Sequence, residues 1–155
     1  MKIKNVNEKG KCIGLLLKHD YKDNIQPECL NHKKLDYSFE SLKYIDDYLN
    51  RIRKNKKKLS KEQKKILILR CGTYVGEVVR KHYPKKFIWI SFDEACKVSK
   101  DFSKVYGGDI TSGLVIYNIK SGSFWLPLNK VYKFLKYGKS DSLKFFAEQL
   151  IAYKE

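Results

Sequence analysis

The sequence predicts an α+β domain in which a small antiparallel sheet of three or four strands packs against a central buried helix and flanking helices. Two observations lead to this prediction. Strand-like segments follow one another along the chain, which favours antiparallel pairing between neighbours. A long segment before them is apolar on more than one helical face, as is typical of a buried helix.

Two helices are expected before the strands. We predict that Ser38 caps the first helix, that its apolar residues lie on one face, and that it ends near Asn55. Ser60 and Gln63 have the spacing of a capping box, so the second helix is predicted over residues 61–82. This second segment is the central helix of the expected fold.

Strands are predicted over residues 86–91, 113–118 and 123–126, because these segments are rich in β-branched and aromatic residues. Residues 119–122 between the last two are expected to form a hairpin turn. The intervening residues 92–112 are predicted to be a polar loop that carries at most a helical turn.

Two more helices are expected after the strands. Pro127 is suited to the first position of a helix, and Gly138 is suited to end it. Ser140 is predicted to cap a last helix. The expected organisation is therefore an N-terminal segment, residues 1–34, whose order the sequence leaves open, and one domain over residues 35–155.

The composition indicates a folded basic protein. Hydrophobic residues make up 43% of the 155 residues, which argues against intrinsic disorder. The net charge of +16 is typical of proteins with an anionic partner, such as a nucleic acid, an anionic membrane or an acidic protein. However, 29 of the 33 basic residues are Lys, and an AT-rich genome also produces many lysines without functional pressure.

The cysteines and the N-terminus predict a cytoplasmic protein. Four widely spaced cysteines fit reduced thiols better than a disulfide framework. The longest apolar run near the N-terminus, Ile13 to Leu17, is too short for a signal peptide or a membrane span. We therefore expect no interaction with a membrane.

A basic run from Arg51 to Lys65 holds nine basic residues and a single acidic residue. As a partner-binding surface it would neutralise phosphates or carboxylates, although it contains no aromatic residue on which a base could stack. The alternative is a solvated helix end, turn and helix start. The candidate contacts in the run are Arg51, Arg53, Lys54, Lys56, Lys57 and Lys58.

The central helix contains the most specific local pattern, Gly72 and Gly76 four residues apart, followed by Glu77. Two helical glycines cost roughly 1 kcal/mol each relative to Ala, so we expect another element to pack closely against them. Glu77 beside them is a candidate for hydrogen bonding or partner contact. With Tyr74 and Trp89, Glu77 also forms the least favoured hypothesis, an enzymatic site.

Other clusters of chemically active residues match no known pattern. Cys12, His19, Cys29 and His32 have the right side chains for zinc, but their spacing is not that of a common structural site. A nucleophilic Cys71 or Cys96 with His82, and a cation bound by Asp93, Glu94, Asp101 and Asp109, are likewise disfavoured. We expect no catalytic residue, no metal and no cofactor.

Several motifs together resemble an uncharacterised family of small bacterial α+β domains. They are the helix start Leu35-Asp-Tyr-Ser-Phe-Glu-Ser-Leu42, the segment Gly72-Thr-Tyr-Val-Gly-Glu77, Trp89 in the next strand, and Pro127 before a helix that ends at Gly138. Some comparable domains look like immunity or accessory proteins of toxin systems. The resemblance implies a cytoplasmic protein that neutralises a toxin or another acidic protein by binding it, without catalysis. The alternative is a nucleic-acid-binding module that uses residues 51–65.

Overall fold

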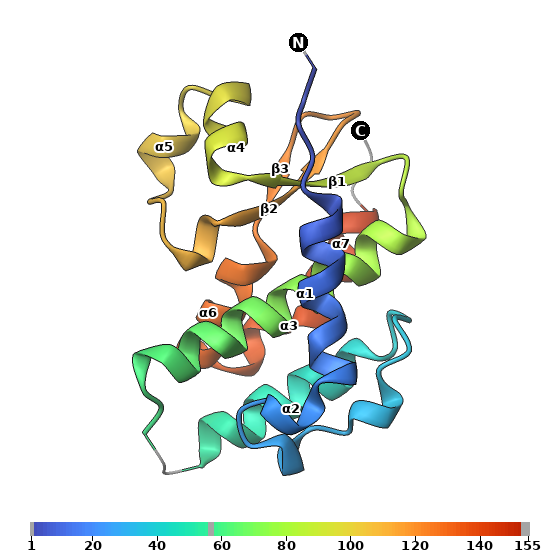
Figure 1. The fold of residues 1–155 in the computed structure, drawn as a ribbon, viewed down its shortest axis with the longest axis vertical. Helices are drawn as coiled ribbons and strands as arrows, with labels where there is room; N and C mark the ends of the chain where they lie inside the picture. The colour runs from blue at the N-terminus through green and yellow to red at the C-terminus, as the bar shows by residue number, and fades with distance from the viewer. Residues whose placement is uncertain (1, 56–57, 153–155) are drawn as a thin grey trace.

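The computed structural model describes residues 2–55 and 58–152. It is an α+β fold, as the sequence predicts: a three-stranded antiparallel sheet in the order β1-β2-β3 lies at one end of a helical body (Figure 1). The strands are β1 (Phe87–Ser91), β2 (Leu114–Asn118) and β3 (Phe124–Trp125). The helices are α1 (Asn7–His19), α2 (Leu42–Lys54), α3 (Lys61–His82), α4 (Phe92–Val98), α5 (Phe102–Val105), α6 (Pro127–Tyr137) and α7 (Leu143–Ala152).

Helix α3 crosses the middle of the molecule and is buried over most of its second half (Figure 1). Its first turn has the predicted capping box: the Ser60 hydroxyl accepts from the Gln63 amide at 3.1 Å, and Gln63 Oε1 accepts from the Ser60 amide at 2.9 Å. These two bonds satisfy amides that have no partner within the helix. The local sequence therefore fixes where this helix begins.

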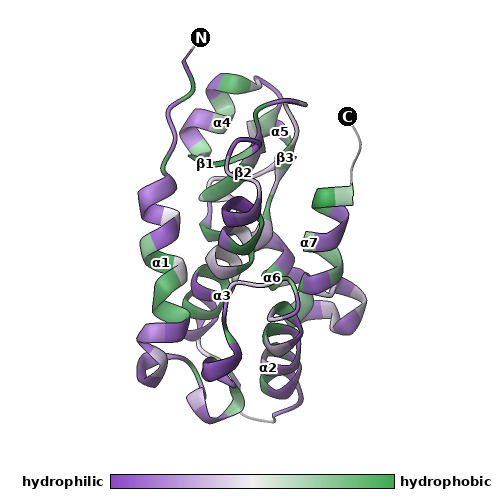
Figure 2. Ribbon diagram, turned by 90° about the vertical axis from the view of Figure 1, so that its right-hand side faces the viewer, coloured by the Kyte–Doolittle hydropathy of each residue, from purple (hydrophilic) through white to green (hydrophobic). Residues whose placement is uncertain are grey.

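The N-terminal segment, left open by the sequence, packs on the domain. Helix α1 lies across α3, and three 3₁₀ turns (Tyr21–Asp23, Pro27–Cys29 and His32–Lys34) follow it. Arg70 of α3 holds the end of α1, since its guanidinium donates to the Asp20 carboxylate at 2.7 Å and to Asn24 Oδ1 at 2.8 Å. Figure 2 colours α1 and α2 in alternating purple and green, as expected of amphipathic helices with one face on this core.

Residues 92–112 differ from the predicted polar loop, because they contain α4, α5 and the 3₁₀ turn Ile110–Ser112. Ala95 and Phe102 from these helices join Ile90 and Val115 in a second apolar cluster, separate from the main core. Successive residues of β1 and β2 point to opposite faces of the sheet. The second cluster thus covers the face that does not pack against α3.

Two helix starts also differ from expectation. Ser38 Oγ accepts from the Ser41 amide at 3.1 Å, but a 3₁₀-like turn intervenes and α2 itself begins at Leu42. Helix α7 begins at Leu143 rather than just after Ser140, which lies in the 3₁₀ turn Lys139–Asp141. Its first amides are bonded by Asp46 of α2, a cap from a distant segment that a local pattern cannot reveal.

Candidate functional site

Glu77 is a buried carboxylate whose hydrogen bonds are internal. Its side chain is 1% exposed, and Arg80 donates to both oxygens, from Nε at 2.6 Å and from Nη2 at 2.9 Å. Trp89 Nε1 donates to Oε2 at 3.1 Å. A carboxylate this buried and this fully bonded cannot reach a partner at the surface, so Glu77 is removed from the predicted partner-binding residues.

The indole of Trp89 lies between the backbones of two helices. A β-carbon built at Gly76 of α3 would be 2.2 Å from the ring, and one at Gly10 of α1 would be 2.4 Å from it. A β-carbon at Gly72 would be 2.8 Å from Leu128 of α6. Both positions in α3 require glycine because another element packs closely against them. Gly76 faces Trp89 of β1, and Gly72 faces Leu128 of α6.

Tyr74 takes part in a separate network. Its hydroxyl accepts from the Tyr37 amide at 2.9 Å and is bonded to Ser41 Oγ at 2.8 Å, and burial raises its pKa. The Tyr37 ring stacks on the Tyr74 ring with centroids 4.8 Å apart. The structure thus brings Glu77 and Trp89 together, but it holds the hydroxyl of Tyr74 against the start of α2.

The described residues of the basic run do not form one continuous surface. Arg51, Arg53, Lys54 and Lys58 are exposed, while Lys56 and Lys57 lie outside the residues that the structure describes. Arg51 lines a small pocket with Tyr44 and Asp47. The guanidinium of Arg53 instead lies at the end of α6, where a β-carbon on Gly138 would be 2.7 Å from Nη1. The side chains of Arg51 and Arg53 therefore lie on different faces of the molecule.

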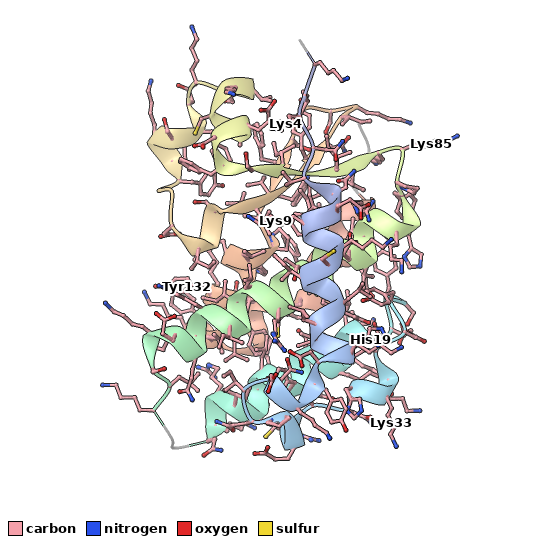
Figure 3. All side chains as sticks on the ribbon, in the orientation of Figure 1. Lys4, Lys9, His19, Lys33, Lys85 and Tyr132 are labelled. Carbon is pink, nitrogen blue, oxygen red and sulfur yellow. The ribbon has the colours of Figure 1, made fainter. Side chains whose placement is uncertain are left out.

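A groove between α3 and α6 adds residues that the sequence did not associate with the run. This α3–α6 groove has a volume of about 290 Å³ and is lined by Lys64, Ile68, Tyr132, Leu135 and Lys136. The apolar side chains form its floor, and lysines from both helices flank it. Figure 3 places Tyr132 on the same side of the molecule as the first half of α3. In the sequence, the spacing of four residues between Tyr132 and Lys136 is the signal that places an aromatic and a basic side chain on one face of α6.

The thiols and imidazoles are dispersed. Cys71 is completely buried, and burial raises the pKa of its thiol, which makes it a poor nucleophile. His82 Nδ1 is bonded to the Val78 carbonyl at 2.7 Å, and His32 stacks on Tyr21 at 3.8 Å. Within residues 2–55 and 58–152, no three His, Cys, Asp or Glu side chains are grouped so that they could hold a metal ion.

The fold and its surfaces define a small basic α+β protein with two closely packed glycines in its central helix and a groove flanked by lysines. No protein-family model matches the chain, and comparisons with curated proteins and with solved structures returned no significant match. Among the described helices, none combines the length and the apolar character that crossing a bilayer requires.

Proposed function

We propose that this chain is a non-enzymatic, cytoplasmic binding protein of the bacterial immunity type, which docks an acidic surface of a protein partner in the α3–α6 groove. One observation carries the proposal. The groove combines an apolar floor, Ile68 and Leu135, with Tyr132 and with lysines on both helices. An apolar centre inside a polar rim is the usual anatomy of a protein interface.

The charge around the groove favours an acidic partner. Lys61, in the first turn of α3 and one turn before Lys64, is exposed and extends the positive surface. With a net charge of +16, the whole molecule would attract an acidic partner over a distance and raise the rate of encounter. Binding of this kind weakens with salt, mainly through slower association.

The shape of the groove favours a particular kind of contact. Tyr132 is 43% exposed and stands beside Lys136, so it can cover an inserted apolar side chain while the lysines pair with neighbouring carboxylates. Partly exposed tyrosines at the centre of an interface often contribute about 2 kcal/mol or more to binding. The partner segment is therefore one with an aromatic or aliphatic side chain flanked by Asp or Glu.

A nucleic-acid-binding module is the second candidate, and Tyr132 is the observation that favours it. The basic run lacks an aromatic residue, but the groove supplies one beside Lys64. A base stacked on Tyr132 with phosphates on the lysines would give salt-dependent binding without sequence preference.

The test compares two matched double variants as bait in the native organism. Tyr132→Ala/Lys64→Gln alters the groove. Tyr83→Ala/Lys85→Gln is the control: Tyr83 is 42% exposed, and Lys85 extends into solvent on the other side of the molecule (Figure 3). We expect one acidic protein to be retained by the wild type and the control but lost with the groove variant.

Each other outcome has a definite meaning. Failure of the wild type to retain any protein, or equal retention by the groove variant, would refute the protein-partner proposal. A gel shift of single-stranded RNA or DNA at low salt, lost only with the groove variant, would replace it with the nucleic-acid function.

A further inference from the structure

A second concave site lies on the other flank of α6. This aromatic pocket has a volume of about 310 Å³ and is walled by the rings of Tyr106, Phe124, Trp125 and Phe146. Asn129, Lys130 and Lys133 of α6 bring polar groups to it. It shares no lining residue with the α3–α6 groove, so it stands independently of the function proposed above.

The aromatic walls are held in place by their neighbours. Trp125 meets Phe146 edge-to-face with centroids 6.1 Å apart, and its Nε1 donates to Ser123 Oγ at 3.1 Å. Phe124 packs against Phe102 with centroids 5.0 Å apart. Rings fixed in this way offer an aromatic wall to a ligand without a large loss of side-chain entropy on binding.

The charges at the pocket leave one cation uncompensated. Lys130 Nζ bonds Asp141 Oδ1 at 2.7 Å, and both side chains are largely buried, so that pair is electrically neutral. Lys133 is exposed and makes no ion pair with another described residue. A ligand with a single negative charge therefore matches the site better than a dianion, which Asp141 would also repel.

We propose that the aromatic pocket binds a small aromatic carboxylate. Its ring lies against the pocket wall formed by Trp125 and Phe146, and its carboxylate pairs with the ammonium of Lys133 beside the Asn129 amide. The volume lies at the lower end of the range for small-molecule sites, which limits the ligand to one ring system with a short acidic arm.

The two tryptophans make a direct test possible. Trp89 is completely buried at the contact between α1 and α3, whereas Trp125 forms a wall of the pocket, so a change in emission on binding reports on Trp125. The 155-residue protein is titrated with phenylacetate, which does not absorb at the red edge of tryptophan excitation, and the heat of binding is measured in parallel. We expect saturable quenching or a shift of emission, absent in Trp125→Phe.

Matched ligands and variants identify the contacts. Lys133→Gln is expected to weaken phenylacetate binding about fivefold, the effect of losing an ion pair worth about 1 kcal/mol. Lys120→Gln, in the turn between β2 and β3 and outside the pocket, is expected to leave binding unchanged. Neutral phenylacetamide should bind wild type more weakly than phenylacetate and be insensitive to Lys133→Gln. Both lysines are exposed, and thermal unfolding verifies that each variant is folded.

Three results would overturn the proposal. The first is the absence of saturable phenylacetate binding by either method. The second is equal affinity of wild type and Lys133→Gln for phenylacetate. The third is tighter binding of phenyl phosphate than of phenylacetate, which would reassign the pocket to an aromatic phosphate.

Discussion

The indole N–H of Trp89 donates a hydrogen bond of 3.1 Å to Oε2 of Glu77, and this bond joins β1 to α3 inside the core. The backbone of Trp89 is bonded on its other side: its carbonyl accepts from the Val6 amide and its amide donates to Asn7 Oδ1, both at 2.8 Å. One residue of an edge strand therefore holds α3 and the start of α1. The edge of the sheet is covered at the same place, which removes an unpaired strand edge.

Glu77→Ala is expected to lower the free energy of unfolding by about 3 kcal/mol, because it leaves the donors of Arg80 and Trp89 without their shared acceptor in the core. Urea denaturation followed by circular dichroism measures the change. Glu62→Ala is the control, since Glu62 is exposed and pairs with Lys65 at only 3.4 Å. Wild-type stability of Glu77→Ala would contradict the structural role assigned to this carboxylate.

Gly76→Ala is expected to destabilise the protein by about 3 kcal/mol, at the upper end of the usual cost of overpacking. The added methyl group would lie 2.2 Å from the Trp89 ring, which is completely buried and cannot move aside. Gly107→Ala is the matched control, because no atom lies within 4 Å of its new β-carbon. Thermal unfolding and near-ultraviolet circular dichroism compare the two variants. A Gly76→Ala protein with the melting temperature of Gly107→Ala would refute the close contact.

The elements that could be predicted are those with short-range signals. The capping box at Ser60, Pro127 at the start of α6 and Gly138 at its end each act within a few residues. The α4 and α5 helices were missed because their buried residues are scattered in a polar segment. A usable signal existed in β1 and β2: both are apolar at consecutive positions, which indicates that both faces of the sheet are covered.

The contacts that form the site join residues distant in sequence. The spacing of Gly72 and Gly76 indicates that something approaches α3, but not that Leu128 and Trp89 do. In the same way, the basic run does not indicate that Tyr132 lies beside Lys64. Such pairs depend on how α1, α6 and the sheet pack on α3, which no local pattern determines.

Tyr37→Phe is expected to raise the free energy of unfolding by about 1 kcal/mol. The Tyr37 hydroxyl is buried and has no hydrogen-bond partner among the described residues, and such a group carries an uncompensated desolvation cost. Burial also raises its pKa to about 12. Phenylalanine keeps the stacking on Tyr74 and the ring face under Lys81 Nζ.

Tyr74→Phe is the matched opposite of that variant, because the Tyr74 hydroxyl is bonded to both Tyr37 and Ser41. Tyr74→Phe is expected to lower the free energy of unfolding by about 1–2 kcal/mol. Urea denaturation of both proteins gives the comparison. Equal effects of the two substitutions would show that the hydroxyl networks differ from those described.

Asp46 gives a prediction for pH dependence. Its carboxylate accepts from the Leu143 amide at 2.8 Å and from Ser142 Oγ at 2.7 Å, and so caps α7. Burial nevertheless raises the pKa of Asp46 above its ordinary value of 3.8, since these hydrogen bonds only partly oppose the desolvation. The folded protein therefore holds a proton on Asp46 more tightly than the unfolded chain does.

The sign follows from linkage: a group whose pKa is raised by folding stabilises most at pH values below its unfolded pKa. The contribution of Asp46 is therefore complete below a pH of about 4 and declines as the pH rises through the raised value. Asp46→Asn cannot titrate. The unfolding free energy of wild type minus that of Asp46→Asn should thus decrease across this window, measured by urea denaturation at a series of pH values. A difference that increases with pH would mean that the capping hydrogen bonds outweigh burial, and a carboxyl-detected NMR titration of Asp46 would then give a lowered pKa.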